Sequence, residues 1–439
     1  MKLHTQILLA MALGVLVGWG LQNFTEGGEV VVKTVKAGLE VQSTILDPES
    51  QRAAWLAPFV AVADIFMRLL KMLIVPLILT SIVTGVAGIA GGREFGRLGL
   101  KTLGYYMTTS LLAIVTGLLA INLVKPGIVP DGVEPPLALQ IPAQFEPGEG
   151  TSFGGIVLRM IPENVFGALS ENGLMLQVIV FALIFGYFIG KAPQPHRDRL
   201  GGLFESAFEV MMAVAGWVLK LIPYGVFALV VKVVGETGSS VFAPLLKYMT
   251  VVIAALLFHA LITLPLLLRF VAGVSPVAWF RAMSPALMTA FSTSSSSITL
   301  PVTLEAAEER GRVSNKYTSF VLPLGATINM DGTALYECVG VIFLSQYYAS
   351  VGDFDLTAGK QVFIVVSALL ASVGAAGIPS AGLVMMTAIL TALGLPVDGA
   401  LLLLAIDRPL DMLRTTVNVW SDSCGVAVVA SSEGDQPLV

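Results

Sequence analysis

The chain has 439 residues, of which 55% are hydrophobic and only 13% are charged, and its formal net charge is −5. Soluble domains carry about 25% charged residues, so this composition excludes a soluble enzyme, a nucleic-acid-binding protein and a disordered chain. Several charge-free apolar runs, among them 102–124, 248–268 and 361–397, reach the length of about 20 residues that a membrane-spanning helix needs. We therefore expect a multi-pass α-helical membrane protein.

Eight apolar segments are predicted to be transmembrane helices. In chain order they are 6–24, 54–89, 103–124, 166–190, 205–232, 243–272, 315–348 and 395–430. Two further apolar runs, 284–304 and 361–392, carry serine, glycine and proline at their centres. Non-helical backbone at membrane depth is tolerated only inside a protein or along a water-filled cavity. We therefore predict two re-entrant hairpins, with tips at 292–297 and 374–382.

Loop charges predict the orientation in the membrane. Basic residues gather in 93–101, 191–199 and 269–316, whereas acids outnumber bases in 26–49. Because basic loops stay in the cytoplasm, both termini are expected to be cytoplasmic in a cell membrane. The two hairpins then enter from opposite sides, which indicates an inverted repeat with a transport site near the bilayer midplane.

The last predicted helix places polar side chains on one face, since they follow at steps of three and four residues. They are Asp407, Asp411, Arg414, Thr415, Asn418 and Asp422. A charge at the bilayer centre costs roughly 2.5–3.5 kcal/mol on insertion scales, so this face indicates function. A purely structural salt-bridge stripe is the alternative. It fits poorly because five acids, with Asp331 and Glu337 included, outnumber Arg414 and Arg408, and Arg408 is expected to extend outward.

Carboxylates that lack a cationic partner in a low dielectric must be protonated or bind cations, so the sequence predicts coupling to Na⁺, H⁺ or both. Arg414 offers a planar fork of donors for a carboxylate, and Asp411 lies one turn earlier. Two arrangements are open. The two side chains could pair with each other, or they could hold an amino acid by its side-chain carboxylate and its ammonium group.

A second polar motif, residues 329–333, lies inside an apolar run. Glycine after two polar residues is typical of a helix break, and freed carbonyls with carboxylate oxygens suit a hard cation; a surface turn is the weaker alternative. Glu337 follows Thr333 by one turn. It is a candidate proton carrier, because a buried carboxyl resists ionisation, or else a structural hydrogen-bonding group of the core.

The serine run 292–297 could suggest a nucleophile, but no Gly-x-Ser-x-Gly elbow occurs and His259 has no visible acid partner. A hairpin tip that binds a substrate carboxylate fits better than a hydrolase. Cys338 and Cys424 lie in apolar segments and are expected to be packing residues.

At these residues the chain resembles the glutamate transporter family, the dicarboxylate/amino acid:cation symporters. The matching motifs cover nearly the whole chain; they are 70–77, 105–110, 294–301, 329–333, 374–382 and 407–422. The resemblance implies eight transmembrane helices plus two hairpins, a homotrimer and an elevator mechanism. Residues 1–92 and 126–238 would form a static scaffold, and residues 93–125 and 239–439 a mobile transport domain.

The resemblance also implies ligand roles, residue by residue. The substrate would contact Ser295, Ser296, Thr333, Ile378, Gly382, Asp411, Arg414, Thr415 and Asn418. The first sodium site would use Gly325, Asn329, Asn418 and Asp422, the second Thr327, Ser372, Val373 and Ala375, and the third Tyr106, Thr109, Ser110, Asn329 and Asp331. Many members have glycine where this chain has Ser421, and a second arginine at the position of Ser294 or Met412.

We therefore expect a membrane carrier, not an enzyme, that takes up L-glutamate and/or L-aspartate with Na⁺. Glu337 resembles a residue that animal members link to H⁺ cotransport and K⁺ countertransport, so H⁺ and K⁺ are further candidate coupling ions. Two alternatives stay open. One is a purely proton-coupled glutamate or dicarboxylate symporter, and the other, from a different class, is an anion channel.

Overall fold

The computed structural model describes residues 3–36, 39–90, 95–129, 161–170, 174–237, 242–351, 354–373, 381–396 and 398–437. The elements are α1 (Leu3–Phe24), β1 (Glu29–Lys36), β2 (Leu39–Leu46), α2 (Gln51–Ala90), α3 (Phe95–Val124), α5 (Val165–Ser170), α6 (Met175–Lys191), α7 (Gln194–Leu219), α8 (Ile222–Thr237), α9 (Phe242–Phe258), the π-helix η3 (His259–Thr263), α10 (Leu264–Phe270), α11 (Pro276–Thr293), α12 (Ser296–Glu305), the π-helix η4 (Ala306–Arg310), α13 (Asn315–Ile328), α14 (Asp331–Val351), α15 (Ala358–Val373), α16 (Ala381–Ala392) and α17 (Asp398–Ser432).

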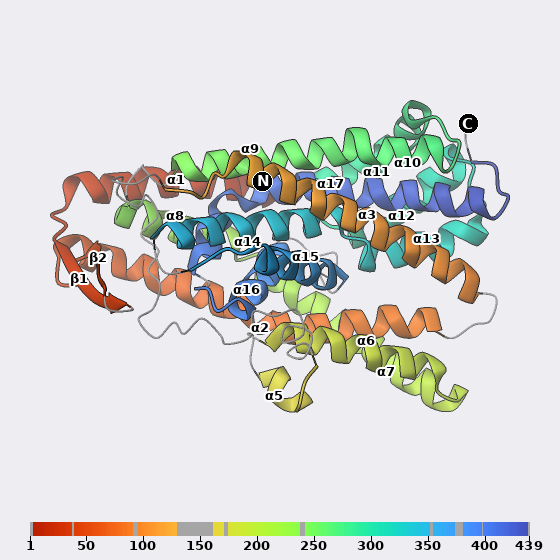
Figure 1. Ribbon diagram of the computed structural model, residues 1–439, viewed down its shortest axis with the longest axis horizontal. Helices are drawn as coiled ribbons and strands as arrows, with labels where there is room; N and C mark the ends of the chain where they lie inside the picture. The colour runs from red at the N-terminus through yellow and green to blue at the C-terminus, as the bar shows by residue number, and fades with distance from the viewer. Residues whose placement is uncertain are drawn as a thin grey trace.

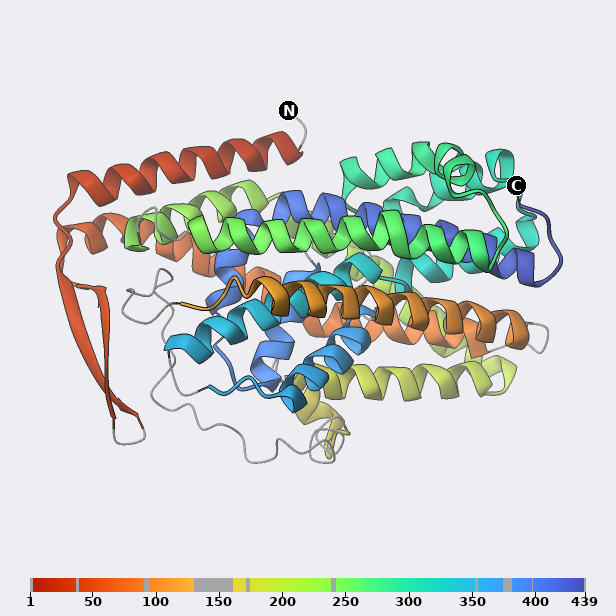
Figure 2. The same cartoon turned by 45° about the horizontal axis from the view of Figure 1, so that its top comes forward.

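The fold is helical, as predicted, and its long helices run mostly along one axis of the molecule (Figure 1). One exception to the all-α expectation is an antiparallel pair in which Glu29 of β1 lies opposite Leu46 of β2. This hairpin projects at one end of the molecule (Figure 2). The segment was predicted to be an acidic loop, but β1 contains four valines, a residue that favours strands.

Two helices of the described chain are long and apolar enough to cross a membrane, Arg97–Val124 and Phe242–Phe270. A third span is counted if α7 and α8, which meet at 53°, are taken together. The predicted span over 205–232 is therefore interrupted, since α7 ends at Leu219 and α8 begins at Ile222. Pro223 explains the break, because proline is tolerated in the first turn of a new helix but not in a helix interior.

The helices form two groups that pack more densely within each group than between them, although they share one hydrophobic core. In the first, α2 contacts α6, α7 and α8, and α1 lies along α8. In the second, α14 and α17 contact each other, and α3, α9, α11, α13 and α16 each contact one or both. Residues 331–348 of α14 are buried throughout, as expected for a helix that is enclosed on all sides. The charged residues of α14 and those of α17 within 407–422 therefore lie in the protein interior.

The first predicted hairpin contains a real helix break. α11 ends at Thr293, α12 begins at Ser296, and the two helices pack against each other. Ser294 has φ 54°, a left-handed conformation that reverses the chain. The hairpin starts earlier than the predicted residue 284. In the second one, α15 and α16 flank residues 374–380, which lie outside the described residues, so that tip stays a prediction.

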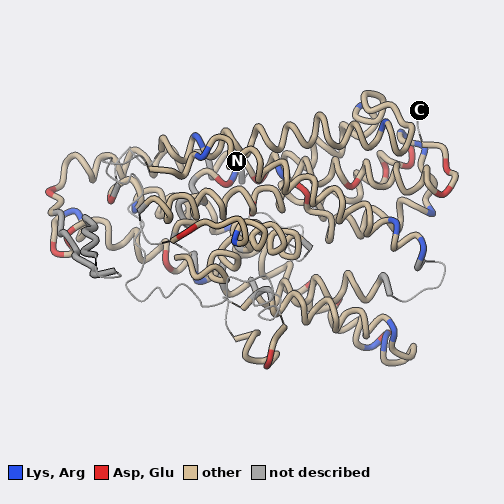
Figure 3. Tube along the Cα trace, in the orientation of Figure 1, with Lys and Arg blue, Asp and Glu red and all other residues tan. Residues whose placement is uncertain are grey.

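Charged residues gather near the ends of the helices and are sparse along their middles (Figure 3). At the end of α17, Lys101 Nζ lies 2.6 Å from Glu433 Oε1, and Arg97 pairs with the same carboxylate. The hydrogen bond from Lys101 lowers the pKa of the Glu433 carboxyl. These ion pairs join the beginning of α3 to the end of α17.

Candidate functional site

The break between α13 and α14 lies at Asn329 and Met330, within the predicted motif. Asn329 has extended backbone, with φ −91° and ψ 94°, while its N–H still donates to the carbonyl of Gly325 at 2.9 Å. Asp331 then opens α14, where a carboxylate is favoured by the free N–H groups of a helix start. The break brings the Asn329 and Asp331 side chains to α3 and α17.

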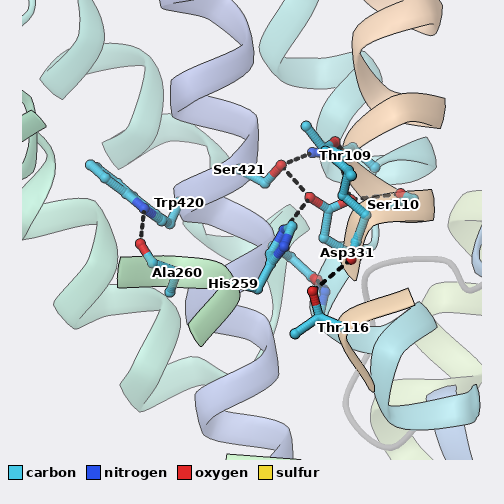
Figure 4. A network of polar contacts seen from close by, with 12 residues as sticks. Thr109, Ser110, Thr116, His259, Ala260, Asp331, Trp420 and Ser421 are labelled. Atoms are coloured by element: carbon cyan, nitrogen blue, oxygen red, sulfur yellow. Dashed lines mark hydrogen bonds and ion pairs between the residues drawn. The ribbon is translucent and has the colours of Figure 1, made fainter. Parts of the chain in front are cut away.

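Asp331 is the centre of a buried polar network (Figure 4). Ser110 Oγ donates to its Oδ1 at 2.6 Å, and Thr109 Oγ1 does so at 3.3 Å. Ser421 Oγ donates to its Oδ2 at 2.6 Å, and His259 Nε2 lies 3.1 Å from that oxygen. Side chains from three helical segments, α3, α17 and η3, thus meet on one carboxylate of α14.

His259 has an acid partner, although none was visible in the sequence. The partner, Asp331, is 72 positions further along the chain, so no local motif reveals it. His259 is fully buried and begins the π-helix η3. In the same π-helix, the carbonyl of Ala260 accepts from Trp420 Nε1 at 3.0 Å, which joins this irregular turn to α17. A lone histidine in a charge-free apolar run was the available signal.

Asn329 links Asp331 to a second acid. Its Nδ2 donates to Ser421 Oγ at 3.0 Å and to Asp422 Oδ1 at 2.9 Å. A Cβ at Gly325 would lie 2.5 Å from Asp422 Oδ1, so only glycine fits there. We call Thr109, Ser110, His259, Asn329, Asp331, Ser421 and Asp422 the Asp331 network.

Tyr106 also lies beside this network. Its hydroxyl donates to the carbonyl of Val321 at 2.8 Å and would be 2.6 Å from a Cβ at Gly325. The structure therefore gathers the side chains predicted for the third sodium site, together with Gly325, Asn329 and Asp422 of the first. Monovalent hard cations bind oxygen atoms such as these. Among the described residues, no group of three His, Cys, Asp or Glu side chains has the arrangement of a metal site.

The residues predicted for the second sodium site are less informative. Thr327 Oγ1 donates to the carbonyl of Pro323 and Ser372 Oγ to that of Leu369, each within its own helix. α13 and α15 are in contact, and Val373 ends α15. Ala375 lies outside the described residues, so this set stays a prediction.

Four charged side chains of α17 form what we call the α17 charge cluster: Asp407, Arg408, Asp411 and Arg414. Arg414 donates to Asp411 Oδ1 from Nε at 2.9 Å and from Nη2 at 2.6 Å, and its Nη1 lies 3.2 Å from Asp407 Oδ1. Arg408 Nη1 donates to Asp411 Oδ2 at 3.3 Å. The expectation that Arg408 extends outward is wrong, since it is 6% exposed. A carboxylate within reach holds the guanidinium inside.

Arg414 is also held by its surroundings. Its guanidinium carbon lies 4.3 Å from the centre of the Tyr336 ring, a cation–π contact. A Cβ at Gly382, the last residue of the second predicted tip and part of α16, would lie 2.9 Å from Arg414 Nη1. The structure thus brings Gly382 to Arg414, as the ligand set requires, while Ile378 lies outside the described residues.

Asn418 fixes the start of α14 against α17. Its Oδ1 accepts from the backbone N–H of Gly332 at 2.7 Å, and its Nδ2 donates to Thr333 Oγ1 at 3.1 Å. A Cβ at Gly332 would lie 2.4 Å from the carbonyl oxygen of Arg414, so the two backbones touch. Thr415 is 5% exposed, as is Thr333. Thr333, Arg414 and Asn418 therefore lie together.

At the first hairpin tip, Ser295 caps α12, because its side chain accepts from the N–H of Ile298 at 3.3 Å. The buried hydroxyls of Ser294 and Ser296 have no hydrogen-bond partner in the described part of the chain. Buried hydroxyls are normally satisfied, so a ligand is a natural partner for them.

Glu337 lies in α14 and is completely buried. Neither of its carboxylate oxygens has a hydrogen-bond partner among the residues that the structure describes. A structural hydrogen-bonding role, which the sequence left open, therefore finds no support there. A buried carboxyl in this setting is costly to ionise.

Buried charges on interrupted helices, gathered from distant parts of a helical membrane chain, define a membrane transport protein. The chain belongs to the Sodium:dicarboxylate symporter family, whose profile matches residues 3–432. It is thus a transporter and not an enzyme.

Named relatives agree with this assignment. The chain is 32% identical to the proton/glutamate-aspartate symporter of Escherichia coli K12 over 98% of its own length and 93% of the relative's. It is 35% identical to rabbit excitatory amino acid transporter 3 over 83% of its length and 78% of the relative's. It is 36% identical to the putative sodium-dependent excitatory amino acid transporter glt-4 of Caenorhabditis elegans over 85% and 82%.

Proposed function

We propose that the protein is a secondary active symporter that couples uptake of L-glutamate and/or L-aspartate to the inward Na⁺ gradient. The observation that carries this proposal is the pairing of Arg414 with Asp411 inside the membrane protein. Two opposite charges one turn apart can each exchange their partner for one end of a zwitterionic acid.

Substrate binding would exchange these ion pairs. Arg414 would turn its fork from Asp411 to the ligand's side-chain carboxylate while its Nη1 keeps Asp407, which lies 3.2 Å away. Asp411 would then receive the ligand's ammonium group. The ligand's main-chain carboxylate would meet the hydroxyl-rich tip at Ser295 and Ser296, where the buried Ser296 hydroxyl is available. The full proposed contact set is Ser295, Ser296, Thr333, Ile378, Gly382, Asp411, Arg414, Thr415 and Asn418.

Sodium ions are the proposed counter-charges of the Asp331 network. Asp331 and Asp422 bring two carboxylates, and Thr109, Ser110, Asn329 and Ser421 add neutral oxygens within hydrogen-bond distance of them or of each other. Na⁺ would displace hydroxyl and amide donors from these oxygens. The names of the relatives support both ions: one is described as sodium-dependent and another as a proton symporter.

We further propose that the chain acts as a homotrimer with an elevator mechanism. The group of α1, α2 and α5 to α8 would be the static scaffold, and α3 with α9 to α17 the moving transport domain. The denser packing within each group than between the two groups supports this division. Residues 374–382 would gate the extracellular side, and both termini would be cytoplasmic in the cell membrane.

Uptake into proteoliposomes tests the coupling ion. With purified protein, we expect an inward Na⁺ gradient to accelerate uptake of labelled L-glutamate or L-aspartate, relative to choline on both sides. Equal uptake in choline, driven by a proton gradient alone, would show that H⁺ and not Na⁺ is the coupling ion. Glu337 is the candidate proton carrier for that alternative. A channel would give a non-saturable flux without counterflow of labelled substrate.

A further inference from the structure

Arg408 has no role in the proposed exchange, although it belongs to the α17 charge cluster. Its side chain is 7% exposed, and Nη1 donates to Asp411 Oδ2 at 3.3 Å. Its buried Nε has no hydrogen-bond partner among the described residues. Removing a guanidinium from water costs free energy. Because Arg408 forms an ion pair with Asp411, we look for its function in that interaction.

Asp411 is held on both oxygens by different residues. Arg414 binds Oδ1 through two nitrogens, at 2.9 and 2.6 Å, whereas Arg408 binds Oδ2 through one. With Asp407 on Arg414, the cluster contains two acids and two arginines, so its formal charges cancel. A ligand that draws Arg414 away from Oδ1 leaves the contact between Arg408 and Oδ2 in place.

We propose that Arg408 is a specificity-determining residue that neutralises Asp411 when the bound ligand has no ammonium group, so that the site accepts dicarboxylates as well as acidic amino acids. The inference rests on the proposed function, in which Arg414 leaves Asp411 for the ligand. A dicarboxylate without an amino group has no cation to pair with Asp411 Oδ1. Without Arg408, Asp411 would then be a buried carboxylate with no cationic partner. An unpaired buried charge is strongly destabilising.

Arg408 has the opposite effect on amino acids. Its positive charge reduces the negative potential that Asp411 presents to an ammonium group, because like charges around one carboxylate compete. Removing the charge therefore weakens dicarboxylates and strengthens, or leaves unchanged, the matching amino acids. A residue that only supports the fold would weaken both ligands together.

The experiment compares ligands that differ only in the amino group. Labelled L-aspartate uptake is inhibited with L-aspartate or succinate, and labelled L-glutamate uptake with L-glutamate or glutarate, in proteoliposomes of the full chain. In Arg408→Gln we expect the ratio of the dicarboxylate to the amino acid inhibition constant to rise by about tenfold or more, one decade in the equilibrium constant. Arg408→Lys, which keeps the charge, should hold the ratio within about threefold of the unmodified protein.

Arg197→Gln is the matched control, because it makes the same chemical change where Arg197 pairs with Asp198 at 3.4 Å on the surface. Its ratio should equal that of the unmodified protein. If Arg408→Gln does not fold, Arg408→Met, which fills a similar volume without charge, repeats the test. Ligand-induced thermal shifts of the purified variants give the same ratio without transport.

One result overturns the inference alone: a ratio that Arg408→Gln leaves unchanged, whether the two affinities stay the same or fall together. A different result overturns the proposed function, and the inference with it. That result is the absence of binding of either ligand to the unmodified protein, in Na⁺ and at every pH tested, while a cooperative thermal transition shows that the protein is folded.

Discussion

The α17 charge cluster and the Asp331 network are both buried, and both use α17, yet they balance charge in opposite ways. In the cluster, Asp407 and Asp411 face Arg408 and Arg414, and the formal charges cancel. In the network, no Lys or Arg of the described chain pairs with Asp331 or Asp422. Hydroxyls, an amide and His259 are the partners there.

This difference indicates what each region lacks. A neutral set of ion pairs can take in a ligand that itself carries both signs, by exchanging partners at little net charge. The network has two carboxylates and no Lys or Arg among its described partners, and burying carboxylates without enough cations in a low dielectric is expensive. The first region suits an acidic amino acid and the second suits cations, so in the proposed mechanism one helix would contact both ligands.

The largest expected effect comes from breaking the cluster. Arg414→Cys leaves Asp407 and Asp411 without their shared cation, and removal of one partner of a buried ion pair costs about 3–5 kcal/mol. We therefore expect affinity for acidic amino acids to fall by about two to three orders of magnitude, while neutral amino acids gain entry. Competition assays with glutamate, aspartate and serine measure both changes. Unchanged glutamate affinity would refute the role of the arginine fork.

The next effect sharpens the contrast with the network. Asp331→Asn removes one carboxylate but keeps its size, and a hydrogen bond to a charged group contributes about 1.5–3 kcal/mol. The Na⁺ concentration for half-maximal uptake should rise by roughly tenfold or more, with little change in substrate affinity at saturating Na⁺. Ser110→Ala, which removes one donor to the same carboxylate, should have a smaller effect. A Na⁺ dependence like that of the unmodified protein in Asp331→Asn would exclude Asp331 as a ligand.

The smallest effect is expected at Glu337, which is buried in α14. Glu337→Gln keeps the shape of the side chain and cannot release a proton. If Glu337 carries a proton during the cycle, net uptake should lose its pH dependence, while exchange of labelled for unlabelled substrate continues. Uptake measured from pH 5.5 to 8.5, against exchange over the same range, separates the two steps. A pH profile identical to that of the unmodified protein would leave Glu337 without a coupling role.

Much of this arrangement could be predicted from the sequence, because helical periodicity alone places Asp411, Arg414 and Asn418 on one face. The break at Asn329 was also visible, since polar residues and glycine interrupt an apolar run. Both predictions depend on residues close together in the chain. They therefore needed no tertiary information.

The misses have physical reasons of two kinds. His259 and Asp331 meet only because a π-helix and a helix break pack side by side, and no local pattern records that contact. Arg408 was predicted to extend outward because an arginine without a partner in the bilayer places its charge at the membrane surface. Its burial follows from Asp411, which lies three residues further on and offers a second oxygen. Arg408 is buried because the Asp411 carboxylate can bind two guanidinium groups, one through each oxygen.

Gly332 provides one close backbone contact between the two regions. It follows Asp331 directly, and its missing Cβ lets it lie against the backbone of Arg414. Interiors packed this closely transmit a displacement instead of absorbing it. A shift of Asp331 when an ion arrives would therefore move the backbone that carries the substrate's arginine. In a single-molecule recording, ion and substrate arrivals would then appear as ordered events in time, with the first setting the waiting time for the second.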